Sequence, residues 1–548
     1  METVLDKNIV IDANTSVTSF SWKGDSDALV FDLQGIRNCL HNFESPIIAV
    51  REKDGVGVTT SGNLSISEVK KGNVVAWLPP ISTSQLGDPS FCETYGVKAA
   101  YYAGGMANAI ASEELVVALG RSGLMGSFGS GGLSLNRLAS AIKTIQSELQ
   151  GAPYMFNLLH NPFEPDVEQL TVESFLENDV RVVEAAAYIQ LTPALIQFRA
   201  AGLKSDETGN IEINNHIIAK ISRKEVAQLF LSPAPEKILQ KLVAVGKITR
   251  EQANLAGNVP LADDITVEAD SGGHTDNQPL VSLLPSIIAL RDKLQEQYQF
   301  KNPVRIGAAG GISTPESVLG AYMMGAAFVV TGSINQSCVE SGASEHTRKL
   351  LSQAAMADVS MAPSADMFEL GARVQVLKKG SFFPMRAQKL YDLYTTFNGI
   401  EEIPITVRED LESKIFNRKI EDIWQDTVAF FEQRNTDQIT KAAQNPKKKM
   451  ALIFRWYLGM ASRWSRDGVE ERKMDYQIWC GPSMGAFNEW VQGTYLEDHT
   501  NRHVDDIAWQ LLKGCIYRSR IQGLKLQGLS FPSKLETYYP QLQESLWK

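Results

Sequence analysis

The chain reads VRIGAAGGIST from Val304 to Thr314 and AAFVVTGSINQ from Ala326 to Gln336. Each stretch begins with a short apolar run, Val304 to Ala308 and Ala327 to Val330, and then enters a glycine turn. That is the pattern of a buried strand followed by a tight loop. Helix-compatible sequence separates the two runs, so the stretch predicts two consecutive strands of a parallel βα repeat.

The two turns contain residues that would present bare backbone N–H groups at the strand ends. Glycine lets the main chain approach a ligand closely, and such turns suit a phosphate group. Paired phosphate turns follow the last two strands of many (β/α)₈ barrels. The sequence therefore predicts a phosphorylated cofactor. Its candidate ligands are Gly310, Gly311, Gly332 and Ser333.

Six further runs have the apolar or small-residue character of buried strands, and each precedes helix-compatible sequence. With the first two they make eight strands, so we expect an α/β fold, a (β/α)₈ TIM barrel. The six runs centre on Ala99 to Ala103, Leu124 to Phe128, Tyr154 to Leu158, Val180 to Ala185, Ile217 to Ile221 and Ile265 to Glu268.

Polar or glycine-rich residues follow several of these strands, at the end where such barrels keep their active sites. A single glycine could serve only to turn the chain. Because the clusters recur at the same strand end, they favour a site. They include Gly104, Gly105 and Met106 after the first strand, Asn157 at the end of the third, and Gly272, Gly273 and His274 after the sixth.

Three side chains near these strand ends carry chemistry. The His274 imidazole titrates near pH 6.5 and can donate or accept a proton, although a lone histidine is often structural. Asn157 offers a donor and an acceptor to a planar heterocycle, or else caps the following helix. Lys220, in the fifth strand, could hold an anionic ring edge or form an ion pair with Glu184 or Glu268.

A chain of 548 residues is too long for one compact core. We expect a small β-rich domain at 1–95, the barrel at 96–400 and a helical region at 401–548. A helical insertion at about 223–263 follows the fifth strand, and we expect it to overhang the barrel mouth.

Composition narrows the class of protein. A net charge of −10 argues against a general role in binding nucleic acid or membrane surfaces. No apolar run approaches the roughly 18 residues of a membrane helix, and the first residues lack a signal-peptide pattern, so we expect a cytoplasmic protein. The five cysteines are scattered without a CxxC pair, so neither a disulfide framework nor a metal site is expected.

A different motif, GPSMG from Gly481 to Gly485, matches the G-x-S-x-G turn of serine hydrolases, and Asp498 and His503 follow in the hydrolase order. This pattern makes an acyltransferase with Ser483 as nucleophile an alternative. A hydrolase sheet needs more strands around the turn than the mostly helical sequence there provides.

Several segments extend from about Gly96 to Val491: YYAGGMANAIASEELVVALG, FNLLHNP, ADSGGHTDNQPL, GAAGGISTPE, VVTGSINQSC and YQIWCGPSMGAFNEWV, among others. They resemble the PfaD family of trans-acting enoyl reductases from bacterial polyunsaturated fatty acid and polyketide synthases, which is related to nitronate monooxygenases. The resemblance implies a barrel that binds flavin mononucleotide (FMN), uses NADPH and reduces enoyl thioesters on an acyl carrier protein.

The resemblance also implies roles for individual residues. Gly104, Gly105 and Met106 would lie along the flavin ring, and Asn157 and Lys220 would bind its polar edge. His274, in the intact motif Gly272-Gly273-His274, would be associated with catalysis. The flavin phosphate would lie on Gly310, Gly311, Gly332 and Ser333. GPSMG would be a family segment rather than a hydrolase turn.

Two other functions stay open. One is a nitronate monooxygenase-type FMN oxidase. The other is a non-catalytic docking partner of a synthase, because the basic run Lys447 to Lys449 could contact an acidic carrier protein. Barrels of this type often form dimers, so a homodimer is a further expectation. No G-x-G-x-x-G dinucleotide motif is present.

Overall fold

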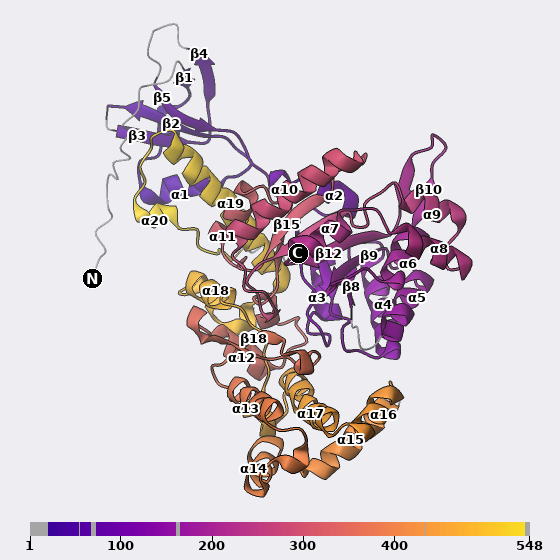
Figure 1. Cartoon of the computed structure of the whole chain (residues 1–548). Coiled ribbons are helices and arrows are strands. Elements are labelled where there is room, and N and C mark those ends of the chain that lie inside the picture. Colours follow the sequence, from indigo (N-terminus) through magenta and orange to yellow (C-terminus); the bar gives the residue numbers. More distant parts are fainter. Residues whose placement is uncertain (1–19, 54, 67–72, 161–164, 433, 543–548) are drawn as a thin grey trace.

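Eight parallel strands close into a barrel in the computed structural model, which describes residues 20–53, 55–66, 73–160, 165–432 and 434–542. Successive barrel strands are hydrogen-bonded neighbours, and the last, β16, pairs with the first, β6. The predicted barrel is confirmed, and each predicted strand overlaps an observed one (Figure 1). The strands are β6 Tyr101–Ala103, β7 Met125–Phe128, β8 Met155–Leu159, β9 Val182–Ala186, β12 His216–Ile221, β13 Asp264–Glu268, β15 Arg305–Ala309 and β16 Val329–Thr331.

Helices cover the outside of the barrel, so the strands are buried on both faces and read as continuous apolar runs. Every residue of β7, for example, is buried. Many of the outer helices begin with side-chain caps: Ser112, Ser134 and Thr192 each accept a hydrogen bond from the backbone of the first turn. These helices are α3 Glu113–Ser122, α4 Leu135–Leu149, α5 Pro165–Glu177, α6 Pro193–Ala201, α7 Lys224–Phe230, α10 Leu280–Tyr298 and α11 Pro315–Met323.

The eighth outer helix comes from the far end of the chain. Helix α19 (Val504–Leu526) packs extensively on α11 and also contacts α3, the helices that follow β15 and β6. In a regular barrel the helix after β16 occupies this place. Part of the predicted C-terminal helical region therefore completes the barrel wall.

Within the predicted insertion at 223–263, α7 belongs to the barrel wall, and the inserted helices are α8 (Glu236–Ala244) and α9 (Arg250–Ala256). Both pack on α6, and α9 also contacts β10 (Leu203–Ser205), which forms a hairpin with β11 (Ile211–Ile213). This hairpin leads from the end of α6 into the start of β12, so it lies at the end of the barrel where strands begin. The expectation that the insertion overhangs the mouth is wrong, because its apolar side is buried on the outer wall.

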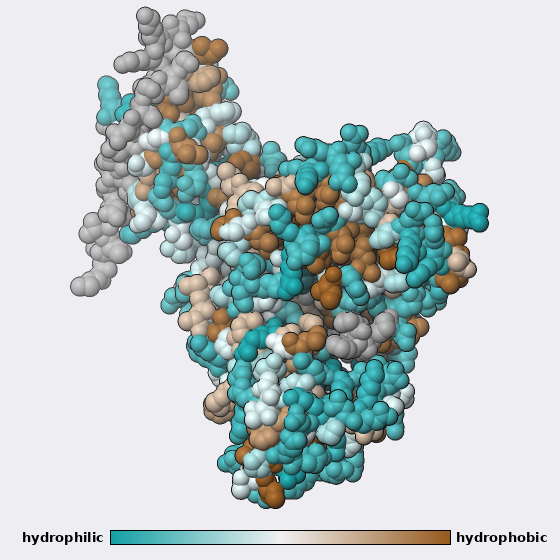
Figure 2. All heavy atoms as spheres, viewed as in Figure 1, coloured by the Kyte–Doolittle hydropathy of each residue, from teal (hydrophilic) through white to brown (hydrophobic). Residues whose placement is uncertain are grey.

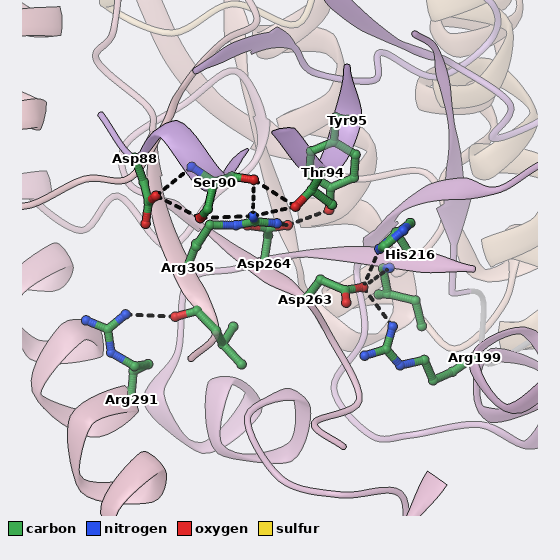
Figure 3. A network of polar contacts seen from close by, with 12 residues as sticks. Asp88, Ser90, Thr94, Tyr95, Arg199, His216, Asp263, Asp264, Arg291 and Arg305 are labelled. Atoms are coloured by element: carbon green, nitrogen blue, oxygen red, sulfur yellow. Dashed lines mark hydrogen bonds and ion pairs between the residues drawn. The ribbon is translucent and has the colours of Figure 1, made fainter. Parts of the chain in front are cut away.

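Charged side chains are paired at this same end of the barrel (Figure 3). Arg305 donates to both carboxylate oxygens of Asp264, at 2.6 and 2.9 Å, and Tyr95 donates to the same carboxylate. Burial raises the pKa of Asp264, and Arg305 opposes that shift without cancelling it. Arg199 donates to the neighbouring Asp263 at 2.8 Å. Since such barrels keep their active sites at the other end, this network has a structural role.

A separate three-stranded sheet lies at the opposite end, the mouth of the barrel. Its order is β14-β18-β17, where β14 (Gly273–His274) comes from the loop after β13. The partners β17 (Val359–Pro363) and β18 (Arg373–Leu377) follow the barrel in sequence, and α13 (Phe383–Thr396) packs on β17. The later part of the chain is thereby joined to the loop that carries His274.

The predicted helical region follows α13. Helices α15, α16 and α17 lie together beside the barrel (Figure 1). On the face shown in Figure 2, this region is mostly hydrophilic, whereas hydrophobic residues gather over the barrel. The helices are α14 Ile405–Asp410, α15 Ile420–Glu432, α16 Thr436–Gln444, α17 Pro446–Asp467 and α18 Ser483–Val491; residues 411–416 form one wider helical turn after α14.

The small β-rich N-terminal part is confirmed. It contains the sheet β3-β2-β5, the ribbon β1-β4 and helix α1, and it shares a core with α19, in which Ile47 and Val58 join Tyr517, Ile521 and Leu524. Its elements are β1 Phe20–Lys23, α1 Leu33–His41, β2 Ile47–Glu52, β3 Gly55–Thr59, β4 Asn63–Ile66 and β5 Val74–Leu78.

No helix among the described residues is long and apolar enough to cross a membrane. The first 19 residues, on which the signal-peptide argument rests, lie outside the described part of the chain.

Candidate functional site

A buried carboxylate lies beneath the glycine turn that follows β6. Glu184, in β9, is fully buried and accepts hydrogen bonds from the Gly105 backbone N–H at 2.8 Å and the Ser127 hydroxyl at 2.9 Å. Tyr102 donates to it at 3.2 Å and the Asn157 amide at 3.3 Å. Glu184 thus ties together the ends of four strands, β6 to β9.

Glu184 also explains why the turn after β6 contains glycine. A Cβ on Gly105 would lie 2.7 Å from Glu184 Oε2 and 2.8 Å from Asn157 Cβ, both too close. From the sequence, Glu184 is expected only as an ion-pair partner of Lys220. The available signal for its larger role is a charged residue inside the small and apolar run VVEAA, because a buried charge needs dedicated partners.

Asn157 is buried at the end of β8, and its NH₂ group donates both to Glu184 Oε2 and to the Glu184 carbonyl, the latter at 3.2 Å. These bonds fix the amide plane. Among the described residues, none donates to its Oδ1. Met106 is partly buried next to the same turn, and its carbonyl oxygen leaves no room for a side chain at Gly129, where a Cβ would lie 1.7 Å away.

Lys220 lies in β12 with its ammonium 3.5 Å from Glu268 Oε1. Burial lowers the pKa of Lys220, but Glu268 and Glu184 raise it by more, so the net pKa is above its ordinary value. Lys220 is therefore a permanent cation at the mouth. Of the two ion-pair partners considered from the sequence, Glu268 is the one in contact.

The turns after β15 and β16 have the form predicted for phosphate binding. Gly310 and Gly311 adopt φ values of 79° and 77°, which only glycine adopts freely. A Cβ at Gly311 or Gly332 would meet no atom within 4 Å. No described residue accepts a hydrogen bond from the backbone N–H of Gly311, Gly332 or Ser333. These turns form an open cradle of unpaired donors.

His274 is on β14, and its Nε2 lies 3.1 Å from Asp366 Oδ1, a residue of the loop between β17 and β18. Burial lowers the pKa of His274, but the hydrogen bond and charge of Asp366 outweigh it, so the pKa is raised. Lys220 and Glu268 are close enough to affect the same titration, which places His274 in the same charged neighbourhood. Asp366 has no motif around it, and nothing in the sequence pattern predicts its role.

The GPSMG segment packs against this site. Gly481 donates its N–H to the Ser333 hydroxyl at 3.1 Å, and a Cβ on Gly272 would lie 2.8 Å from the Cys480 backbone nitrogen. Ser483 begins α18, whereas His503 hydrogen-bonds Glu340 through Nδ1 at 2.6 Å. The segment holds the Gly272 and Ser333 turns together.

All twelve predicted site residues thus lie at the mouth end of the barrel strands. The predicted docking run does not extend freely into solvent: Lys448 pairs with Glu369, while the ammonium groups of Lys447 and Lys449 lie 4.9 Å and 5.5 Å from the ring centroids of Tyr394 and Trp424.

Residues 91–381 match the family model described as nitronate monooxygenase, which covers more than half of the chain. The chain belongs to the nitronate monooxygenase family. Residues 22–80 of this family member match the model "Fatty acid synthase subunit PfaD N-terminal domain", which confirms the PfaD resemblance. Residues 397–476 match "[Acyl-carrier-protein] S-malonyltransferase, inserted helical domain".

Known proteins similar to this nitronate monooxygenase-family chain include a polyunsaturated fatty acid synthase subunit and a polyketide biosynthesis protein. It is 48% identical over 502 residues to a component of the polyunsaturated fatty acid synthase of Thraustochytrium sp., covering 90% of this chain and 33% of that protein. It is 49% identical over 433 residues to the polyketide biosynthesis protein PksE of Bacillus subtilis, covering 79% of this chain and 56% of that one. The chain therefore spans about a third and about half of these relatives.

A solved structure resembles the whole barrel region. The crystal structure of the enoyl reductase domain of MlnA, from the macrolactin biosynthesis cluster of Bacillus amyloliquefaciens, superposes with a TM-score of 0.77 and 41% identity, covering 80% of this chain and all of that one. By family, the chain is of the enoyl reductase type of oxidoreductase found in polyunsaturated fatty acid and polyketide synthases.

Proposed function

We propose that this protein is an enoyl reductase that uses NADPH and FMN to reduce the 2,3-double bond of an enoyl thioester on an acyl carrier protein. The observation that carries the proposal is the open cradle of N–H groups at Gly311, Gly332 and Ser333. It lies at the same barrel end as Lys220 and His274. The similarity to the MlnA enoyl reductase domain supports the reaction class.

The donor set fits FMN. The cradle after β15 and β16 suits a phosphate, because no described residue pairs with its backbone donors or fills the space beside Gly311 and Gly332. Lys220 and the amide of Asn157 would bind the polar edge of the ring, and the side-chain-free turn Gly104-Gly105 would let the ring lie against the backbone. When bound, FMN supplies the hydride, taken from NADPH and delivered to the β-carbon of the substrate.

His274 completes the reaction by supplying a proton. Hydride addition at the β-carbon leaves an electron pair shared between the α-carbon and the thioester oxygen, and a proton must reach the α-carbon. The raised pKa of His274 keeps its imidazole protonated at higher pH than usual. Asp366 stabilises that cation and orients the ring through Nε2, so it acts as a positioning residue.

The carrier-protein partner is supported by the relatives. Two of them are named as synthase or polyketide biosynthesis proteins, and the segment 397–476 matches a domain model from a carrier-protein malonyltransferase. A non-catalytic docking role is the alternative function, and a homodimer remains a prediction.

The absorption spectrum of the purified full chain tests the proposal. We expect a flavin spectrum that bleaches when NADPH is added without oxygen and recovers on addition of a crotonyl carrier protein. His274→Ala should still bleach with NADPH but recover at least about tenfold more slowly. A protein that cannot be reconstituted with FMN would refute the proposed function. Flavin recovery only with oxygen and an alkyl nitronate would instead establish the oxidase that the family model's name describes.

A further inference from the structure

Three arginines of the helical region gather at the rim of the barrel mouth. Arg463 and Arg466 are three residues apart on α17, so their side chains are neighbours on one side of the helix. Arg434 lies in the connection between α15 and α16, and its charge is close enough to affect Arg463. We call these three residues the rim arginines.

Hydrogen bonds fix the part of α17 that carries Arg463 and Arg466 to the mouth. Asn108, two residues after Met106 in the β6–α3 loop, donates from its amide to the Ser462 hydroxyl at 3.0 Å and accepts through its carbonyl oxygen from Arg466 at 3.3 Å. Ser462 directly precedes Arg463 on α17. A site for a reactant entering the barrel would therefore include this end of α17.

Among the described residues, only one of the three rim arginines has an ion-pair partner. Arg466 is paired with Asp467 at 2.6 Å, and the guanidinium of Arg434 lies over the Phe430 ring at 4.8 Å. For half-buried Arg463, no described residue accepts a hydrogen bond from the guanidinium. Burial lowers the pKa of Arg463, and repulsion from Arg434 and Arg466 lowers it further; the Asp467 carboxylate opposes this shift without cancelling it.

A half-buried guanidinium without an acceptor among the described residues, on the same helix as a second arginine, favours an anion from outside the chain. The planar fork of arginine matches a phosphate group in two-point contact. The barrel mouth is also where the reactants of the proposed function arrive.

We propose that the rim arginines bind a phosphate ester carried by a reactant at the barrel mouth. The inference rests on the proposed function for the identity of the reactant. Two reactants carry such a group: NADPH has a 2′-phosphate on its adenosine, and the carrier protein has a phosphodiester on its pantetheine arm. The chemistry of recognition is the same for both sources.

Binding to the full chain, measured by calorimetry without turnover, tests this site. The probes are two matched pairs: adenosine 2′,5′-bisphosphate with 5′-AMP, and 4′-phosphopantetheine with pantetheine. We expect Arg463→Gln to weaken binding of one phosphate-bearing probe about tenfold and to leave its partner probe unchanged. Arg121→Gln, on the outer face of α3 where Arg121 pairs with Glu148, is the matched control and should bind as the unaltered chain does.

The affected pair identifies the source. A change confined to adenosine 2′,5′-bisphosphate assigns the rim arginines to NADPH, and a change confined to phosphopantetheine assigns them to the carrier arm. Arg434 is exposed, so Arg434→Gln provides a second variant if Arg463→Gln does not fold. The site does not exist if every variant that folds, whether Arg463→Gln, Arg434→Gln or both, binds all four probes as the unaltered chain does. Because no reduction is measured, this result is independent of whether the protein reduces enoyl thioesters.

Discussion

The missing side chain at Gly332 leaves the turn after β16 open toward the mouth, although the backbone there does not require glycine. Its φ lies outside the left-handed region, and a Cβ would contact no described atom. Gly105 differs, because Glu184 and Asn157 fill the space that its side chain would need. Crowding by neighbouring protein atoms thus explains why position 105 is glycine, but it does not explain the glycine at position 332.

We therefore expect Gly332→Ala to weaken FMN binding by about ten- to a hundredfold, because the methyl group would occupy the space assigned to the phosphate. The free energy of unfolding of the apoprotein should change by no more than about 0.5 kcal/mol. Flavin fluorescence titration and urea unfolding measure the two effects. Gly320→Ala, also free of contacts but on α11, is the control. Equal flavin affinity in both variants would remove the phosphate from this turn.

The second residue-scale prediction concerns Asp366. The pKa of its partner His274 is raised above the ordinary 6.5. The protonated imidazole therefore persists to higher pH than usual and is lost as the pH rises through the raised pKa. In Asp366→Asn, the charge that does most to oppose the effect of burial on His274 is lost, so the pKa of His274 falls. If protonated His274 is the acid, the alkaline limb of the pH–rate profile moves to lower pH, and more activity is lost at pH 8 than at pH 6.

The profile of kcat/KM against pH, together with the NMR titration of the His274 ring, measures this shift. A uniform loss at all pH values, with the ring titrating as before, would contradict the role assigned to Asp366.

At the scale of elements, α19 packs against two parts of the molecule. One part fills the barrel wall beside α11, and its last turns pack on the N-terminal sheet. Arg520 makes the second contact specific: it is fully buried and donates to the carbonyl oxygens of Asn42, Phe43 and Ser45 at 2.8, 3.0 and 2.7 Å, just beyond the end of α1. Burial lowers the pKa of Arg520 to about 10, so it stays charged at neutral pH.

Arg520→Met should lower the free energy of unfolding by about 3 kcal/mol, because it leaves several partly buried carbonyl groups without donors. Hydrogen exchange should accelerate first in β2 and β3. Lys525 is on α19, like Arg520, and forms an exposed ion pair with Glu536, so Lys525→Met should cost less than about 1 kcal/mol. Similar losses in the two variants would show that Arg520 does not clamp the N-terminal sheet.

At the scale of the whole molecule, the barrel and its mouth could be predicted because each parallel strand has a local sequence pattern, an apolar run that ends in glycine. This pattern predicts the positions of Gly310, Gly332 and Lys220. Glu184 left a weaker signal, since its partners come from three other strands. Asp366 left none, because it reaches His274 only through the pairing of β14 with β18.

The location of the insertion and of α19 could not be predicted for a similar reason. An amphipathic helix shows which of its faces is buried but not which neighbour covers it. The sequence favours a place over the mouth for the insertion, which instead packs on α6, and a separate region for α19, which instead contacts α11.

The contact between Arg520 and the end of α1 joins residues up to 481 positions apart. On a ribosome adding roughly 5–20 residues per second, the N-terminal sheet waits about half a minute or more for the helix that completes its core. During that interval Ile47 and Val58 have no α19 to cover them. The N-terminal sheet is thus made well before α19 but completes its core only after α19 has been made, and until then its uncovered apolar face is prone to aggregation.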